Sequence, residues 1–423
     1  MIMSVLKKYI ALSFLTIIGT LSLRAQTIVR LSLEEIITKV EAEYPLVLQY
    51  DSRIKSLQAK ADGSSSWMPP TFSFGLNSFP YQLEMIKRKE DPMNWAALKF
   101  SAEQMIPNSS KLRAKGGYYS SLKQGQQNNV EWTKNILRTQ VRILYYQRIV
   151  AEHKLSLIAE NRELLKLFIN ISESRYTYNQ ADLSTIFKAK AKLKELNNME
   201  TMAKAGVTES NIGLNTLLNL PTETPFKIDT VVVLKNYDSI MLVQDTASVQ
   251  RSDITSMTSS IRSMELNRSW MATGSKPDFG LRVSHMNMFG MPNQFSIMGM
   301  VTIPIAPWSS KMYKTEVQSM TYEIRAMNLE RENMKLMATR MINEKLAMLK
   351  YERQQFGNYQ KDINPLYRKN MEANLLAYKQ NTGNFFVLLD AWDMLFMKQL
   401  EQLDKLNLLL RLQAEYEYET ERR

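Results

Sequence analysis

The chain has 423 residues and a formal charge of +12 at pH 7, from 54 basic and 42 acidic side chains. It contains no cysteine, which excludes disulfides, thiolate metal sites and a lipid-modified amino-terminal cysteine. The basic residues are spread along the chain and are not clustered with aromatic residues, so we expect no nucleic acid partner.

The first 25 residues have the pattern of a secretory signal peptide. Lys7 and Lys8 precede an uncharged run over 9–23, and Ala25 supplies a small residue at the expected cleavage point. The run is shorter than the roughly 20 residues that cross a bilayer as a helix. We therefore predict cleavage after Ala25, with a retained amphipathic anchor as the alternative.

The two halves of the remaining chain repeat each other. Ser309-Ser310-Lys311 matches Ser109-Ser110-Lys111, and the same offset places Tyr378-Lys379-Gln380 on Tyr178-Asn179-Gln180. Repetition at a fixed offset indicates one structural unit used twice. The predicted divisions are a signal peptide at 1–25, a first repeat at 26–220, a linker at 221–245 and a second repeat at 246–423.

Each repeat is predicted to begin with helix. In the first repeat, Ser32 and Glu35 have the spacing of a capping box, which opens a short helix that stops near Pro45. A second helix then continues to about Ser64.

Two pairs of strands follow. Apolar and polar residues alternate over 72–77 and 98–103 in the first repeat, and over 279–284 and 295–303 in the second, which predicts strands. Strands of about ten residues can cross an outer membrane with apolar side chains in lipid and polar ones in a lumen. Two hairpins on a soluble core are the alternative. Four strands cannot close a sheet, and an open edge is not tolerated in lipid, so membrane insertion requires an oligomer.

Long helices complete each repeat. Between Ser109 and about Tyr178 there is no proline, and apolar residues recur every three or four positions, which predicts a helix of roughly 105 Å. Pro365 is expected to kink the counterpart in the second repeat. A short extended run, Thr230 to Leu234, lies in the linker. The other predicted helices are Leu183 to about Leu218, Ser309 to about Tyr378, and Asn384 to about Tyr418.

This order of elements resembles the TolC outer-membrane efflux family. Tyr378-Lys379-Gln380, Gly383 and Val387-Leu388-Leu389-Asp390-Ala391 are similar to the periplasmic tip of that family. Arg251-Ser252-Asp253-Ile254 is similar to the segment that opens its second repeat. Gln104-Met105-Ile106-Pro107 also resembles the heavy-metal (copper and silver) branch.

The resemblance implies a mainly α fold with a small β part, in two tandem repeats that are each a β-hairpin plus a long α-helical hairpin. A homotrimer would form a twelve-stranded β-barrel among the lipids of a Gram-negative outer membrane, continuous with an α-helical barrel in the periplasm.

The resemblance also implies a function. The protein would be a passive exit duct that receives substrates from an inner-membrane pump through a periplasmic adaptor, with metal cations or small toxic compounds as cargo. The alternatives are the duct of a type I protein secretion system and a non-channel coiled-coil periplasmic scaffold. We expect no enzyme and no cofactor, because His153 and His285 are the only histidines and no glycine-rich phosphate loop is present.

Acidic residues at the helix tips are the candidates for a pore gate. The resemblance places Asp390, and less directly Asp182 and Asp393, at the constriction, where a ring of three carboxylates would select cations. A solvated residue that favours the helix dipole is the alternative for Asp390. The residues predicted to contact the adaptor are Tyr178, Gln180, Leu183, Tyr378, Gln380 and Gly383.

Methionines crowd around the second hairpin. Thioethers bind Cu(I), and the strand parity puts Met298 and Met300 on the lumen face. The alternative is that methionine serves as a flexible packing residue, as it does elsewhere in this chain. The residues predicted to make transient metal contacts are Met286, Met288, Met298 and Met300.

Overall fold

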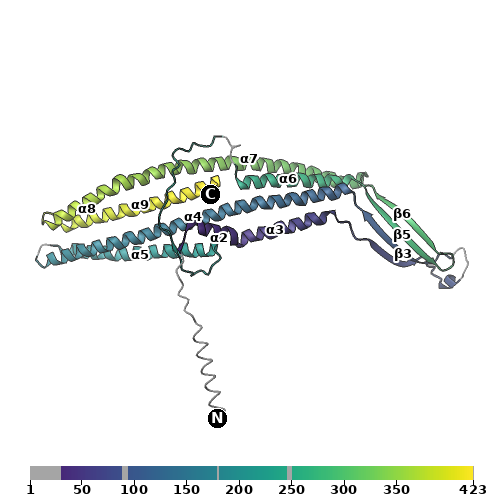
Figure 1. The fold of residues 1–423 in the computed structure, drawn as a ribbon, viewed down its shortest axis with the longest axis horizontal. Helices are drawn as coiled ribbons and strands as arrows, with labels where there is room; N and C mark the ends of the chain where they lie inside the picture. Colours follow the sequence, from purple (N-terminus) through teal and green to yellow (C-terminus); the bar gives the residue numbers. More distant parts are fainter. Residues whose placement is uncertain (1–29, 88–93, 179–180, 245–249, 423) are drawn as a thin grey trace, which may run out of the picture. The chain divides into compact units, whose positions relative to one another are not determined.

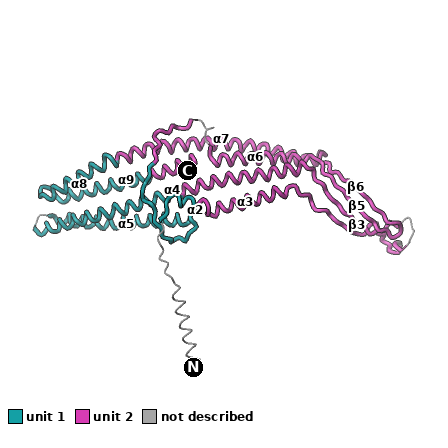
Figure 2. The backbone as a smooth tube through the Cα atoms, in the orientation of Figure 1, with its two compact units in different colours: residues 1–39, 141–234, 359–407 teal, residues 40–140, 235–358, 408–423 magenta. Residues whose placement is uncertain are grey.

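The computed structural model describes residues 30–87, 94–178, 181–244 and 250–422. The predicted signal peptide, Gln180 and the first residues of the second repeat, 246–249, lie outside these ranges. The chain divides into two compact units, and each combines parts of both predicted repeats (Figure 2). Unit 1 comprises 1–39, 141–234 and 359–407, and unit 2 comprises 40–140, 235–358 and 408–423.

Unit 1 contains two helical hairpins. Helix α4 (Ser109–Tyr176), which enters the unit at residue 141, is followed by α5 (Leu183–Leu217), and α8 (Asn364–Lys379) is followed by α9 (Phe385–Thr420) (Figure 1). The predicted long helix and its return helices are confirmed, with ends that differ by at most two residues from those expected. We call residues 177–182 tip 1 and residues 380–384 tip 2.

Pro365 interrupts the long helix of the second repeat, as predicted. Helix α7 (Pro307–Asn358) ends in a π-helical turn, Tyr359–Ile363, and Pro365 lies in the first turn of α8. Proline has no N–H to donate, and its ring clashes with the carbonyl four residues earlier, so the preceding turn must widen.

The core of unit 1 lies among α4, α5, α8 and α9. Trp392 stacks on Phe396 with ring centroids 5.7 Å apart, and its Nε1–H donates to Asn161 Oδ1 over 3.0 Å. Leaving the buried indole N–H of Trp392 or the side-chain amide of Asn161 without a partner would be costly. This bond therefore favours the observed packing of α9 against α4. Large side chains of the core include Ile158, Leu165, Phe168, Ile186, Leu196, Tyr378, Phe385, Leu388, Trp392 and Phe396.

Unit 2 contains the sheet. The strand order is β2-β3-β5-β6 and every pair is antiparallel, so the hairpins of the two repeats join through β3 and β5. In the described part of the chain, the outer edges of β2 and β6 have no strand partner. The strands are β2 (Thr71–Asn77), β3 (Ala97–Ile106), β5 (Asp278–Met288) and β6 (Gln294–Thr302).

The remaining elements confirm the capping box and shift the linker strand. Ser32 N and Oγ donate to Glu35 Oε2 over 2.8 and 2.9 Å, and α2 begins at the next residue. The run 230–234 forms no ladder; the strand in this region is instead β4, which pairs in parallel with β1. These elements are β1 (Arg30–Leu31), α2 (Leu33–Glu43), α3 (Pro45–Asp62), β4 (Lys227–Ile228), α6 (Ser252–Ala272) and short 3-10 turns at Gly63–Ser65, Leu83–Lys87 and Thr273–Ser275.

None of the described helices combines the length and the apolar composition needed to cross a membrane.

Candidate functional site

One face of the sheet exposes large apolar side chains. The register aligns Phe74, Phe100, His285 and Phe295 in one row across all four strands. The predicted alternation is confirmed, and Phe74 is 80% exposed in the single chain. An exposed apolar band of this kind marks a surface that meets lipid or another protein. Its other exposed members are Phe72, Leu76, Phe279, Leu281, Val283, Ile297 and Val301.

The opposite face of the sheet is polar. Glu103 on β3 lies beside Arg282 on β5, whose Nε donates to Glu103 Oε2 over 2.9 Å. In the next row of the same face, the hydroxyls of Ser73 on β2 and Ser101 on β3 share a hydrogen bond of 2.7 Å. The face therefore offers charges and hydroxyl groups to whatever fills the space in front of it.

All four predicted metal-contact methionines lie on this polar face. The register puts Met286 beside Lys99, Met298 beside Arg282, and Met300 beside Gly280. Met288 also has this parity, but it is buried. Their contact with metal stays a prediction, and two of them stand next to a cationic side chain, which opposes a cationic ligand.

Sequence analysis missed a fifth methionine on the polar face. Met105 Sδ and Met300 Cε lie 2.7 and 2.9 Å from the point that a Cβ on Gly280 would occupy. Because Gly280 on β5 has no side chain, Met105 of β3 and Met300 of β6 can approach each other across that strand. Extending the alternation of the strand at 98–103 to residue 105 would have found Met105. Within the described residues, no group of three or more His, Asp or Glu side chains could hold a metal ion.

The three acidic residues predicted near the gate differ in their surroundings. Asp182 caps α5: its Oδ1 accepts from Ser184 N over 3.0 Å and its Oδ2 from Ser184 Oγ over 2.7 Å. These bonds lower the pKa of Asp182. Asp393 lies 3.3 Å from Lys192 Nζ. Asp390 is exposed and, within the part of the chain that the structure describes, has no ion-pair partner.

Lys192 connects α5 with α9. Burial lowers the pKa of Lys192, but the carboxylates of Glu195 and Asp393 outweigh it, so the pKa is raised overall. The ion pair therefore persists at neutral pH, and Asp390 is the one of the three for which the described residues supply neither an ion pair nor a capping hydrogen bond.

Tyr378, one of the predicted adaptor contacts, is buried in unit 1. It is 2% exposed, because its ring packs against Phe385 at 5.5 Å and its hydroxyl lies 3.0 Å from Ser172 Oγ. The guanidinium of Arg175 lies over the ring at 4.3 Å and donates to the Tyr378 carbonyl over 2.7 Å. Tyr378 thus joins the two hairpins inside unit 1 and cannot offer its ring to a partner in this conformation.

Gly383 has a backbone role in tip 2. Its N–H donates to the Ala377 carbonyl over 3.0 Å, and an added Cβ would lie 3.0 Å from Ala377 Cβ and 3.1 Å from Tyr378 N. A larger residue would push the turn away from the end of α8.

The exposed surface of the tips combines predicted and missed residues. Tyr178 is 74% exposed, and Leu183 and Gln380 are also exposed. Phe386 lies exposed near tip 2 under the Lys188 ammonium at 4.4 Å, and Val387 beside it is exposed as well. Sequence analysis missed Phe187, a further exposed apolar residue near the tips.

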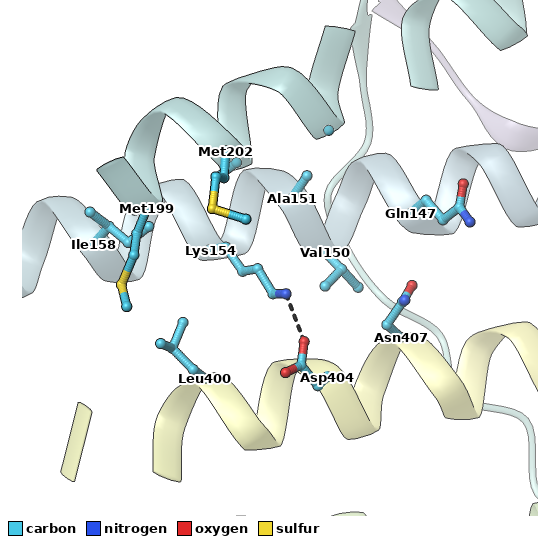
Figure 3. Close-up of a pocket in the computed structure, with 12 residues that line it drawn as sticks. Gln147, Val150, Ala151, Lys154, Ile158, Met199, Met202, Leu400, Asp404 and Asn407 are labelled. Carbon is cyan, nitrogen blue, oxygen red and sulfur yellow. Dashed lines mark hydrogen bonds and ion pairs between the residues drawn. The ribbon is translucent and has the colours of Figure 1, made fainter. Parts of the chain in front are cut away.

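An apolar hollow of about 400 Å³ opens among α4, α5 and α9 of unit 1 (Figure 3). Met199, Met202 and Leu400 line it, and an ion pair of 2.6 Å joins Lys154 Nζ to Asp404 Oδ1 beside them. None of the predicted site residues lies in this hollow.

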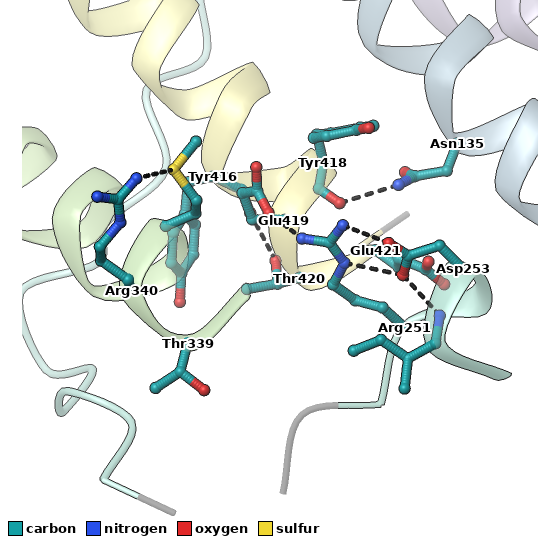
Figure 4. Close-up of polar contacts among 12 residues, drawn as sticks. Asn135, Arg251, Asp253, Thr339, Arg340, Tyr416, Tyr418, Glu419, Thr420 and Glu421 are labelled. Atoms are coloured by element: carbon teal, nitrogen blue, oxygen red, sulfur yellow. Dashed lines mark hydrogen bonds and ion pairs between the residues drawn. The ribbon is translucent and has the colours of Figure 1, made fainter. Parts of the chain in front are cut away.

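A charged cluster in unit 2 surrounds the segment that opens the second repeat (Figure 4). The Arg251 guanidinium pairs with Glu419 and donates to Asp253 Oδ2 over 2.7 Å, and it lies 5.0 Å from the centre of the Trp132 ring. Burial raises the pKa of neighbouring Tyr418 to about 12. The end of α9 is therefore bonded to the start of α6.

No family model matches this chain, and no curated protein matches it. Solved structures do. The outer-membrane channel OprN has a TM-score of 0.74 at 13% identity, with 92% of this chain and 89% of that chain covered. The transmembrane channel protein CusC gives 0.73 at 12% identity, covering 92% and 91%, and the outer membrane protein VceC from Vibrio cholerae gives 0.71 at 12%, covering 92% and 95%. This chain has the fold of these outer-membrane channels. At such low identity the likeness establishes the fold alone.

Proposed function

We propose that the protein is the outer-membrane channel of a tripartite efflux system. In this proposal it is a passive duct without enzymatic activity, its sheet lies in outer-membrane lipid, and its helices extend into the periplasm. An inner-membrane pump and a periplasmic adaptor deliver the cargo. The observation that carries the proposal is the exposed apolar face of the sheet, backed by a polar face, in a chain with the fold of outer-membrane channels.

A homotrimer accounts for two features that a single chain leaves open. The edges of β2 and β6 lack partners among the described strands, and lipid does not tolerate free edges. On α7, Tyr322, Leu329 and Leu336 are exposed at intervals of seven residues, which is the spacing of a seam between packed helices. If β6 of one copy pairs with β2 of the next and the copies pack along α7, the strand edges and the exposed residues of α7 are both covered.

At the tips, Asp390 supports a cation-selecting ring and the exposed residues Tyr178, Leu183 and Gln380 support contact with the adaptor. Three exposed, uncompensated carboxylates around one axis would hold cations. Asp182 is the weaker gate candidate because Ser184 already occupies both of its oxygens.

For the cargo, we propose a metal cation or a small toxic compound: the methionines of the polar face support a soft metal cation, whereas the cationic side chains beside Met286 and Met298 support small toxic compounds. Growth of a deletion strain on copper, silver, dyes and bile salts separates the two. Lost tolerance to copper or silver supports the metal, whereas unchanged metal tolerance with new sensitivity to dyes removes it.

Conductance tests the duct itself. Protein purified from outer-membrane fractions should form ion-conducting channels in planar bilayers. Recovery in the soluble periplasm, together with no conductance, would contradict the proposal and favour a periplasmic scaffold.

A further inference from the structure

We propose that Lys99 makes the polar face of the sheet an anion-attracting surface, so that the duct favours solutes carrying a carboxylate, sulfonate or phosphate group. This inference rests on the proposed channel function and names a class of cargo for it. It assigns a selectivity role to a side chain that neither the alternation of the strands nor the tip motifs single out.

The charges on the polar face leave Lys99 unbalanced. Register and parity place two acidic residues there, and each has a basic partner: Glu103 pairs with Arg282, and Asp278 Oδ2 lies 2.6 Å from Lys111 Nζ. Lys99 belongs to the row of Gly75, Met286 and Gln294, which contains no acid. Across the described residues, Lys99 has no carboxylate partner, so its positive charge is available to a ligand.

Space for a ligand lies beside this lysine. Gly75 is directly opposite Lys99 on β2, and apart from Gly75 and its two chain neighbours no described heavy atom lies within 4 Å of the point where a Gly75 Cβ would stand. The glycine forms part of a hollow of about 310 Å³ in front of β2, β3 and β5. Its polar lining residues include Ser73, Lys99, Ser101, Glu103 and Arg282.

The chemistry of the hollow fits an anionic group better than a cation. An ammonium is a compact positive charge that binds carboxylate or phosphate oxygens, and the neighbouring hydroxyls can donate hydrogen bonds to the same group. Glu103 does not cancel this preference, because Arg282 neutralises it. In a trimer three such lysines would face one lumen and raise the local concentration of anions. Of the two proposed cargoes, these positive charges favour small toxic compounds that carry an anionic group over a metal cation.

Ion selectivity in planar bilayers tests the inference. The chloride-to-potassium permeability ratio is obtained from the zero-current potential in a KCl gradient. Lys99→Gln, which removes the charge and keeps a polar side chain, should lower this ratio about twofold or more, and Lys99→Glu should lower it further. The matched control is Lys87→Gln, which removes the same charge from the 3-10 turn outside the sheet. Measuring both in an Asp390→Asn background separates the sheet from the tips.

The possible results separate the role inferred for Lys99 from the proposed channel function. Channels whose permeability ratio is the same in the Lys99→Gln variant as in the unaltered protein overturn the inference and leave the duct standing. An equal fall for Lys87→Gln also overturns it, since the effect would then be one of net charge. Unaltered protein that forms no channels overturns the duct and the inference together.

Discussion

Replacing Arg251 by methionine should loosen the junction between α6 and the end of α9 in unit 2. The Arg251 guanidinium pairs with Glu419, and its Nε and Nη2 donate to Asp253 over 3.1 and 2.7 Å. The side chains of Arg251 and Glu419 are 12% and 7% exposed. Methionine keeps the apolar stem of the arginine but leaves Glu419 buried without its ion-pair partner.

The expected cost follows from that burial. Removing one partner of a buried ion pair costs about 3–5 kcal/mol. We expect the lower end, about 3 kcal/mol, because both groups keep some access to water. Each 1.4 kcal/mol is about a factor of ten in an equilibrium, so local opening of the junction should become roughly a hundredfold more frequent.

Hydrogen exchange read by mass spectrometry measures this opening directly. Peptides from 408–422 and from the start of α6 should exchange roughly a hundredfold faster in Arg251→Met, while peptides from the core of unit 1 stay unchanged. The double variant Arg251→Met/Glu419→Gln should recover part of the protection, since it removes the stranded charge. Unchanged exchange in the single variant would refute the idea that this pair holds the junction.

The pH dependence of the same variant has a definite sign. Burial raises the pKa of Glu419, which Arg251 opposes. A carboxyl whose folded pKa lies above its unfolded value adds stability as pH falls through the folded pKa and loses it as pH rises. Without Arg251 the pKa should rise further, so after correction for intrinsic rates the junction in Arg251→Met should be better protected near pH 5 than at pH 7. The opposite trend would contradict the assignment.

Three further predictions concern unit 1 and the tips. Trp392→Ala should destabilise the core by about 3–5 kcal/mol, whereas Trp392→Phe should cost less because it keeps an aromatic ring there and loses only part of the indole with its hydrogen bond to Asn161; denaturant midpoints by circular dichroism compare them, and equal midpoints would count against the packing account. Ser32→Ala should weaken α2 by about 1 kcal/mol through loss of the capping box, visible as faster exchange over 33–43, and unaltered exchange there would refute it. Asp390→Ala should reduce block of the channel by multivalent cations in planar bilayers, and block that stays at the level of the unaltered protein would remove the ring hypothesis.

Most of the secondary structure was predictable from local sequence signals. The capping box of Ser32 and Glu35, the alternation along the four strands and the interruption at Pro365 each depend on neighbours within a few residues, and all are confirmed. The linker strand was misplaced because a two-residue ladder depends on its partner β1, which lies far away in the sequence.

The environment of individual site residues was harder to predict, because it depends on contacts between distant segments. Tyr378 is buried against Ser172 and Arg175, which come about two hundred residues earlier, so the tip motif alone did not reveal its burial. In the same way, only the pairing of β3 with β5 reveals that Arg282 neutralises Glu103 and that Lys99 stands alone.

We propose that three copies of this chain enclose one duct through the outer membrane. Native mass spectrometry of protein extracted from outer-membrane fractions in mild detergent tests it most directly. We expect particles of three chains that fall apart when Leu329 and Leu336 on α7 are both replaced by lysine. Recovery of single chains from unaltered protein, under conditions in which the helices remain folded, would contradict it.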